Sequence, residues 1–167
     1  MIKGEASIYV SSPNAVTPFH MDPEHNILLQ LRGQKVMTLF PAADPVLTPG
    51  ALQEEFHRGA HRNLPFRDEY AGKGQPIPLT PGEGLYVPVK APHWVQNGPT
   101  TSVSLSVTWR SEWSYREADA HAFNRLLRRT GLRPAMPARY PRQNLLKAYA
   151  WRALAKARRI AGNPDPQ

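Results

Sequence analysis

The sequence predicts a mainly β protein, a small antiparallel sandwich or barrel, followed by C-terminal α-helices. Three observations support this fold class. Short apolar and β-branched runs recur through the first two thirds of the chain, separated by turn residues such as Asn97-Gly98. The run from Ser102 to Trp109 alternates between hydroxyl and apolar side chains, which is typical of a strand with one polar face. After Arg110 the apolar residues recur with a helical period instead.

The expected elements define two regions. The strands are expected over residues 6–11, 17–31 with an interruption near Pro23, 34–40, 85–89 and 102–109. One helix is expected from a capping box at Ser114 to Gly131, and a second over about residues 141–161. Residues 42–80 contain five prolines and four glycines. Long loops of this kind are often functional, so we expect a lid-like loop over the mouth of a functional site. The predicted domains are therefore a β-barrel core over residues 1–112, with the lid 42–80, and a basic helical extension over residues 113–167.

The net charge of +8 is concentrated near the C-terminus. Residues 1–113 carry nine Lys/Arg and ten Asp/Glu, whereas residues 114–167 carry twelve and three. Three interpretations remain open for this basic segment: helices that pack on the barrel or on a second copy, a nucleic-acid surface, or a membrane-surface helix. We expect a homodimer through the C-terminal helices, with nucleic acid as the alternative partner.

Several signals are absent from the sequence. There is no cysteine, no run of about 18 apolar residues and no apolar signal-peptide core near the N-terminus. We therefore expect a cytoplasmic protein without a membrane span. No P-loop, dinucleotide fingerprint or nucleophile elbow is present either.

A metal site is the main chemical signal. His20 and Asp22 are two residues apart in a predicted strand, so their side chains point to one face, and Asn26 shares their parity. A second histidine, His93, follows a strand and a turn about 70 residues downstream. Two imidazoles and one carboxylate form the facial triad that holds non-haem Fe(II) and leaves positions open for substrates. The sequence therefore predicts a metal site at His20, Asp22 and His93.

Three segments around these residues resemble the JmjC-type, cupin-like Fe(II)/2-oxoglutarate oxygenases, in particular their asparaginyl-hydroxylase-like branch. They are Thr17-Pro18-Phe19-His20-Met21-Asp22, Leu31-Arg32-Gly33-Gln34-Lys35, and Gly82-Glu83-Gly84-Leu85-Tyr86-Val87-Pro88 with His93-Trp94. The resemblance covers about residues 6–112. It implies a double-stranded β-helix, that is, a jelly-roll or cupin-like barrel, with iron ligands at His20, Asp22 and His93.

The same resemblance implies which residues bind the cosubstrate 2-oxoglutarate. In that branch, a lysine 15 residues after the first histidine binds the distal carboxylate, and Lys35 has this position. Thr17 and Asn26 match two further contacts, whereas Thr108 stands where the branch has an asparagine. A buried lysine inside a barrel is costly unless it meets an anion, which agrees with this role for Lys35.

The implied activity is that of an Fe(II)- and 2-oxoglutarate-dependent dioxygenase that hydroxylates a peptide side chain or a small metabolite. The alternative, from another class, is a non-catalytic cupin-like binding or regulatory module whose basic tail contacts nucleic acid. Members of the family usually carry an N-terminal region that supports the sheet. Here we expect that support to be absent, replaced by the C-terminal helices, or provided by another subunit.

The remaining histidines are weaker candidates. His57 and His61 are four residues apart, but Gly59 lies between them, so we interpret both as solvated loop residues. His25 and His121 have no partner that the sequence indicates.

Overall fold

The computed structural model describes residues 2–42, 44–137 and 144–162, and the chain forms two compact units. The barrel unit contains the residues up to Leu47 and Arg62–Ser111, and the helical unit contains Thr48–His61 and the residues from Glu112 onward. This division differs from the predicted domains chiefly in residues 48–61, which group with the C-terminal helices. Among the described residues, no helix is long and apolar enough to cross a membrane.

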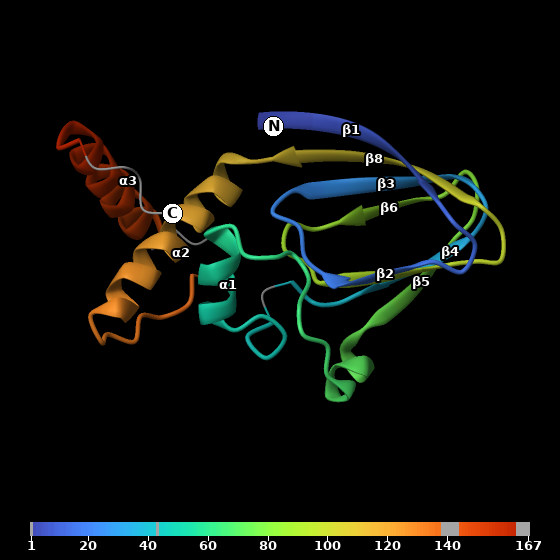
Figure 1. Ribbon diagram of the computed structural model, residues 1–167, viewed down its shortest axis with the longest axis horizontal. Coiled ribbons are helices and arrows are strands. Elements are labelled where there is room, and N and C mark those ends of the chain that lie inside the picture. Colours follow the sequence, from blue (N-terminus) through green and yellow to red (C-terminus); the bar gives the residue numbers. More distant parts are fainter. Residues whose placement is uncertain (1, 43, 138–143, 163–167) are drawn as a thin grey trace. The chain divides into compact units, whose positions relative to one another are not determined.

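Two four-stranded antiparallel sheets form the barrel unit (Figure 1). The first sheet has the order β1-β8-β3-β6 and the second the order β2-β7-β4-β5. Most consecutive strands therefore lie in opposite sheets, which is the connectivity of a jelly roll. The predicted fold class, a mainly β cupin-like barrel with C-terminal helices, is confirmed. The strands are β1 (Ile2–Ser11), β2 (Val16–His20), β3 (His25–Arg32), β4 (Lys35–Leu39), β5 (Gln75–Leu79), β6 (Gly84–Val87), β7 (His93–Asn97) and β8 (Ser102–Arg110).

The interior of the barrel unit has an apolar part and a polar part. Strand β8 turns its hydroxyl side chains inward, and Ser102 and Ser104 are fully buried. The amide of Gln30 donates to Ser102 Oγ at 3.0 Å, and Ser104 Oγ donates to Gln30 Oε1 at 2.7 Å. The alternation predicted one polar face on this strand, and in the structure that face points inward. The apolar core comprises Leu28, Met37, Leu79, Val87, Ala91 and Val95.

The predicted strand over residues 17–31 is in fact two strands in different sheets. Strand β2 ends at His20 and β3 begins at His25, so Asp22 lies in the connection between them. Pro23 lacks the N–H that a continuous ladder would need at this point. The expectation that His20, Asp22 and Asn26 share one face of one strand is therefore wrong.

The predicted lid over residues 42–80 contains more regular structure than expected. Helix α1 (Gly50–His57) lies in the helical unit, whereas the 3-10 helix η1 (Asp68–Lys73) and strand β5 lie in the barrel unit. Strand β5 pairs with β4 at the edge of the second sheet. Pro76 and Pro78 are two positions apart, so the N–H groups that they lack belong to one side of the strand, and an edge strand tolerates this.

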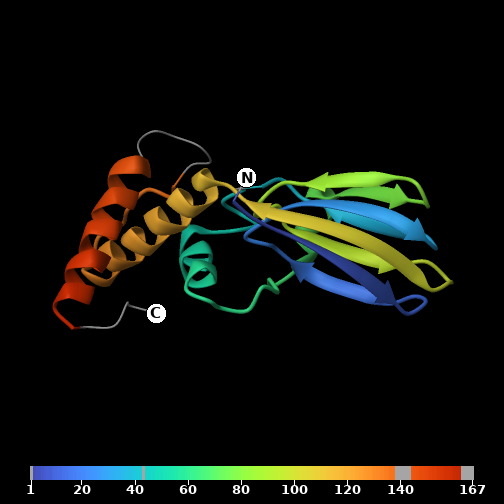
Figure 2. The ribbon, with the colours of Figure 1, turned by 90° about the horizontal axis from the view of Figure 1, so that it is seen from above.

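The helical unit consists of α1, α2 (Glu112–Arg129) and α3 (Asn144–Ile160). Helix α2 packs against both α1 and α3, and Figure 2 shows α3 beside α2. The two expected C-terminal helices are present, although α2 begins at Glu112 rather than at Ser114, and the expected start near residue 141 lies outside the described residues. Leu146 is 79% exposed and Tyr149 55% exposed on α3. The expected packing of these helices on the barrel or in a homodimer stays a prediction.

Candidate metal centre

The structure brings His20, Asp22 and His93 together within the barrel unit. His20 is the last residue of β2 and His93 the first of β7, and the two lie opposite each other in the antiparallel pair. Their ring centroids are 4.1 Å apart. Asp22 is placed by the chain that leaves β2, where its carbonyl oxygen accepts a hydrogen bond of 2.9 Å from the backbone N–H of Lys90. Two paired strands and one short connection thus position the cluster.

The ligand atoms of the cluster converge. Asp22 Oδ2 lies 3.8 Å from His20 Nε2 and 3.8 Å from His93 Nε2. These separations are too long for hydrogen bonds. One donor atom from each residue lies within 4.8 Å of the others, so the cluster could hold a metal ion. The arrangement is the two-histidine, one-carboxylate set that suits non-haem iron.

Backbone carbonyls orient both imidazoles. The Nδ1 atoms of His20 and His93 lie 2.7 Å from the Pro18 oxygen and 2.9 Å from the Ala91 oxygen. Because a carbonyl oxygen only accepts, each Nδ1 carries a hydrogen, and the Nε2 atoms are the ring nitrogens that face the cluster. A hydrogen bond of this kind on the far nitrogen is typical of metal-binding histidines.

Burial keeps His93 neutral. Its side chain is 3% exposed, and this burial, together with the neighbouring His20, lowers the His93 pKa to about 4. A histidine must be neutral to bind a metal ion. His93 is therefore in the binding form at neutral pH without any change in the fold.

A segment distant in sequence lies along β2 beside the cluster. The backbone N–H of Leu64 donates to the Phe19 oxygen at 2.8 Å, and that of Met21 to the Arg62 oxygen at 3.3 Å. His20 also forms an isolated antiparallel bridge with Asn63. This segment belongs to the region predicted as a lid, and its role as a lid stays a prediction.

Sequence analysis did not identify Arg62 as a site residue. Its Nη1 donates to Asp22 Oδ1 at 2.9 Å, and its Nη2 lies 3.9 Å from Glu24 Oε2. Arg62 therefore occupies one carboxylate oxygen of Asp22 and leaves the other facing the two imidazoles. Burial raises the pKa of Glu24, while the positive charge of Arg62 opposes that shift. No sequence motif marks Arg62, since it is forty residues from Asp22 in a loop without a periodic pattern.

Lys35 is buried in the second sheet. Its residue is 7% exposed, and desolvation lowers the pKa of its ammonium group. It lies opposite Asn97 on β7, in the same sheet as His93, which lies opposite Leu39. Within the described part of the chain, no carboxylate pairs with Lys35. The barrel unit thus contains a buried cation without an anion.

The other predicted cosubstrate residues occupy both sheets. Thr17 of β2 is exposed and lies opposite Val95 of β7. Asn26 and Thr108 lie opposite each other in the first sheet. Asn26 Oδ1 accepts a 2.7 Å hydrogen bond from Ser106 Oγ. The metal and cosubstrate roles assigned to all these residues stay predictions.

Three of the remaining histidines have aromatic neighbours. His25 stacks on Trp109, with ring centroids 5.3 Å apart, and its Nδ1 lies 2.7 Å from the Tyr86 hydroxyl oxygen. His57 stacks on His121 with centroids 5.0 Å apart, within the helical unit. His57 ends α1, so His61 does not continue its helical face. His25 and His121 therefore have partners that the sequence did not indicate.

Parts of this chain are similar to known proteins. The lysine-specific demethylase JMJ30 of Arabidopsis thaliana is 33% identical over an alignment that covers 58% of this chain and 24% of that protein. The chain therefore spans about a quarter of the length of this relative. A cupin superfamily protein of Desulfitobacterium hafniense matches with 16% identity and a TM-score of 0.42, covering 65% of this chain and 68% of that one. A Cupin 2 conserved barrel domain protein of Salinispora arenicola matches with 17% identity and a TM-score of 0.41, covering 65% and 64%.

A family profile covers most of the barrel unit. Residues 3–115 match the family described as a cupin-like domain, which is more than half of the chain. With the relative named above, this match confirms the JmjC-type, cupin-like resemblance over this segment. The chain belongs to the cupin-like domain family.

Proposed function

We propose that this protein is an Fe(II)- and 2-oxoglutarate-dependent oxygenase that hydroxylates a peptide side chain or a small metabolite. The observation that carries the proposal is the cluster of His20, Asp22 and His93, in which one carboxylate oxygen lies 3.8 Å from each of two Nε2 atoms. The 33% identity to a lysine-specific demethylase supports this class among the activities found on cupin-like folds.

The chain's own residues suit such a site. His93 presents a neutral nitrogen, His20 presents its Nε2 atom, and Asp22 presents Oδ2 to the same point. Arg62 holds the other oxygen and so fixes the carboxylate plane. When bound, Fe(II) and 2-oxoglutarate would supply the oxidising chemistry, in which O2 converts the keto acid to succinate and CO2 and one oxygen atom enters a C–H bond of the substrate.

Lys35 supports the choice of a dicarboxylic cosubstrate. Four positions along β4 separate Lys35 from Leu39, the residue opposite His93, and four strand positions correspond to about 13 Å. A lysine side chain and an extended five-carbon diacid together can bridge such a distance. The Lys35 ammonium would meet the distal carboxylate, with Thr17, Asn26 and Thr108 as further contacts. Pairing with an anion would offset the cost of burying the charge.

An anaerobic titration tests the proposal. The purified protein is mixed with Fe(II) and then with 2-oxoglutarate, and we expect the weak visible charge-transfer band of the chelated keto acid. Succinate, which lacks the keto group, is the matched control and should produce no band. Admission of O2 should then release succinate from 2-oxoglutarate. A protein that binds neither Fe(II) nor 2-oxoglutarate would contradict the proposal.

The second candidate is a non-catalytic cupin-like binding module whose basic helices contact nucleic acid. The observation that favours it is the concentration of twelve Lys/Arg in residues 114–167. Clustered cations suffice for salt-dependent binding to phosphates. Binding of a DNA or RNA duplex without formation of the charge-transfer band would favour this candidate over the oxygenase.

A further inference from the structure

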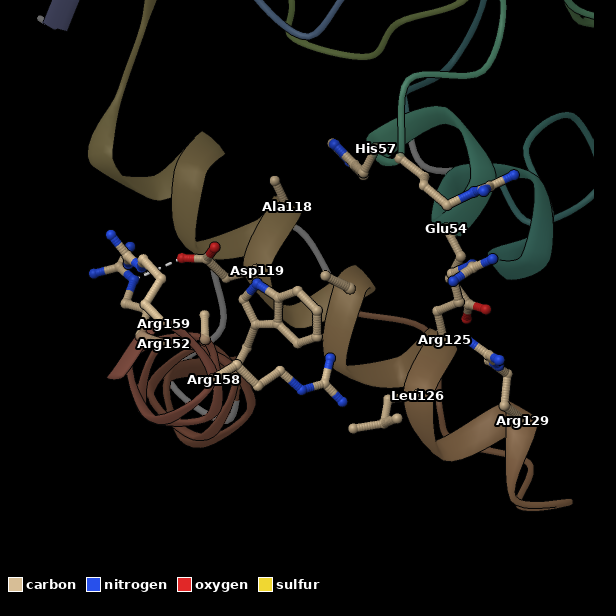
Figure 3. A pocket seen from close by; sticks show the side chains of 14 residues that line it. Glu54, His57, Ala118, Asp119, Arg125, Leu126, Arg129, Arg152, Arg158 and Arg159 are labelled. Carbon is tan, nitrogen blue, oxygen red and sulfur yellow. Dashed lines mark hydrogen bonds and ion pairs between the residues drawn. The ribbon is translucent and has the colours of Figure 1, made fainter. Parts of the chain in front are cut away.

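The helical unit contains a pocket of about 430 Å³ (Figure 3). It is lined by residues of α1, α2 and α3 and by Arg58, which directly follows α1. Its residues are distinct from the His–Asp–His cluster, which belongs to the barrel unit. The volume falls in the range of small-molecule sites, roughly 300–1,000 Å³. Small side chains, among them Ala118, Ala122 and Ala155, line it and leave the space that larger residues would fill.

Arginine dominates the polar lining of this pocket. Six arginines but only two carboxylates, Glu54 and Asp119, contribute to it. Both carboxylates are already paired: Arg128 binds Glu54 through its Nε and Nη2, each at 3.0 Å, and Arg152 Nε donates to Asp119 Oδ2 at 2.6 Å. The acidic groups of the pocket are therefore neutralised, and an excess of positive charge remains.

Two arginines of the pocket without an ion pair among the described residues, Arg129 and Arg158, account for much of that excess. Arg125 and Arg58 differ from them, since both contact Glu55 at 3.0 Å. For Arg129 on α2 and Arg158 on α3, by contrast, no residue of the described ranges supplies an ion pair. Figure 3 shows Arg158 extending from α3 toward the α2 side of the pocket. Two guanidinium groups from different helices suit an anion of about two charges, and a phosphomonoester carries about −1.5 to −2 near pH 7.

A tryptophan also belongs to the lining. Trp151 of α3 contributes its indole, together with Leu126 and the alanines. An indole beside apolar side chains favours a planar ring, because stacking is available to any flat π system. Side chains suited to an anion and to a planar ring therefore line the same pocket.

From these features we propose that the pocket binds a phosphomonoester of a planar heterocycle, the chemical class of nucleoside monophosphates. Arg158 and Arg129 hold the phosphate and Trp151 contacts the ring. The site is independent of the proposed oxygenase centre, since it uses none of the same residues.

Calorimetric titration of the full chain with AMP tests the proposal. Adenosine contains only the planar ring with its sugar, and inorganic phosphate only the anion, so both serve as controls. We expect AMP to bind at least about tenfold more tightly than either, because the charge-assisted contact and the stacked ring both contribute to its affinity. A single-stranded oligonucleotide without a terminal phosphate distinguishes a nucleic-acid surface. If it binds the protein while AMP does not, the proposal is overturned in favour of nucleic acid.

Charge-matched variants separate the pocket from general electrostatics. Arg158→Gln should weaken AMP binding about tenfold or more. Arg133→Gln removes the same charge from an exposed residue of the helical unit outside the pocket, and should leave AMP affinity nearly unchanged. Circular dichroism establishes that both variants fold. Equal losses in the two variants, or no AMP binding by the native protein at millimolar concentration, would overturn the proposal.

Discussion

The barrel unit and the helical unit both gather polar side chains, but they hold them differently. In the barrel unit, His20 and His93 are opposite residues of paired strands, and backbone carbonyls orient both rings. In the helical unit, long arginine side chains extend from helix surfaces, and ion pairs such as Arg152–Asp119 hold some of them. Strand register therefore sets one site, and flexible charged side chains set the other.

This difference matters for the chemistry that each site can support. A metal centre needs donor atoms held to within a fraction of an ångström, which rigid elements with supporting hydrogen bonds provide. An anion pocket tolerates looser geometry, because the attraction between charges decreases slowly with distance. We therefore expect the proposed catalysis in the barrel unit and the proposed ligand binding in the helical unit. The predictions below test whether the two kinds of site behave so differently.

Removal of a cluster ligand should have the largest effect. In His20→Ala, two of the three ligands remain. Loss of a residue that only supports a metal ligand weakens metal binding by up to roughly 100-fold. We expect loss of the ligand itself to lower the Fe(II) affinity by more than that. His61→Ala is the matched control, since His61 is an exposed histidine of the helical unit. Metal analysis after anaerobic loading measures both. Unchanged iron content in His20→Ala would remove His20 from the site.

Replacement of Lys35 should affect the cosubstrate alone. Lys35→Met keeps the apolar stem but removes the charge, and loss of a charge-assisted contact costs about 1.5–3 kcal/mol, or roughly ten- to a hundred-fold in 2-oxoglutarate affinity. Fe(II) binding should be retained, because Lys35 is remote from the ligand atoms along the strand. Lys156→Met, on the exposed surface of α3, is the control. Equal 2-oxoglutarate affinity in both variants would exclude Lys35 from the pocket.

Local patterns predicted much of the barrel. The alternation in β8 identified a face of hydroxyl side chains, because side chains alternate between faces along any strand. The three cluster residues were also predicted together, but on the wrong ground, since Asp22 belongs to a connection rather than to the strand of His20. Strand β5 was missed because Pro76 and Pro78 argue against a strand, and only its edge position makes them tolerable.

Long-range contacts account for most of what the sequence did not predict. The ion pair of Arg62 with Asp22 depends on how the chain returns to β2 after α1, which no local period encodes. The stacking of His57 on His121 likewise depends on the packing of α1 against α2. Both features arise because residues 48–61 group with the helical unit while Arg62 returns to the barrel unit.

Arg62 offers a more moderate test of how the metal ligands are held. Arg62→Ala should release one oxygen of Asp22 and weaken Fe(II) binding by about tenfold, the lower end of the range for outer-shell partners. The low end is expected because the Arg62 side chain is 58% exposed and solvent screens its charge. Arg67→Ala removes an exposed arginine that pairs only loosely with Glu69 at 3.5 Å, and serves as the control. Identical iron affinities in the two variants would show that Arg62 does not orient Asp22.

The smallest effect concerns the pH dependence of stability in the metal-free protein. Desolvation lowers the pKa of Lys35 below its ordinary value of 10.5, so the folded chain binds fewer protons at this residue than the unfolded chain does. The contribution of Lys35 to stability therefore rises with pH between its folded pKa and 10.5, and is least favourable below that window. We expect the difference in unfolding free energy between the native protein and Lys35→Met to shift in favour of the native protein as the pH rises through this range.

Lys147 of the helical unit provides the comparison for this effect. Burial lowers its pKa as well, but its Nζ donates to the Ala135 oxygen at 2.9 Å and the charge of Glu54 opposes the shift. A partnered ammonium should lose less on burial than an unpartnered one, so Lys147→Met should show the weaker pH dependence. Urea unfolding at a series of pH values up to about 10.5 measures both variants. If Lys147→Met shows the stronger dependence on pH, burial of Lys35 does not cost more free energy than burial of Lys147. The high cost of burying Lys35 would then no longer support the proposal that it binds an anionic cosubstrate.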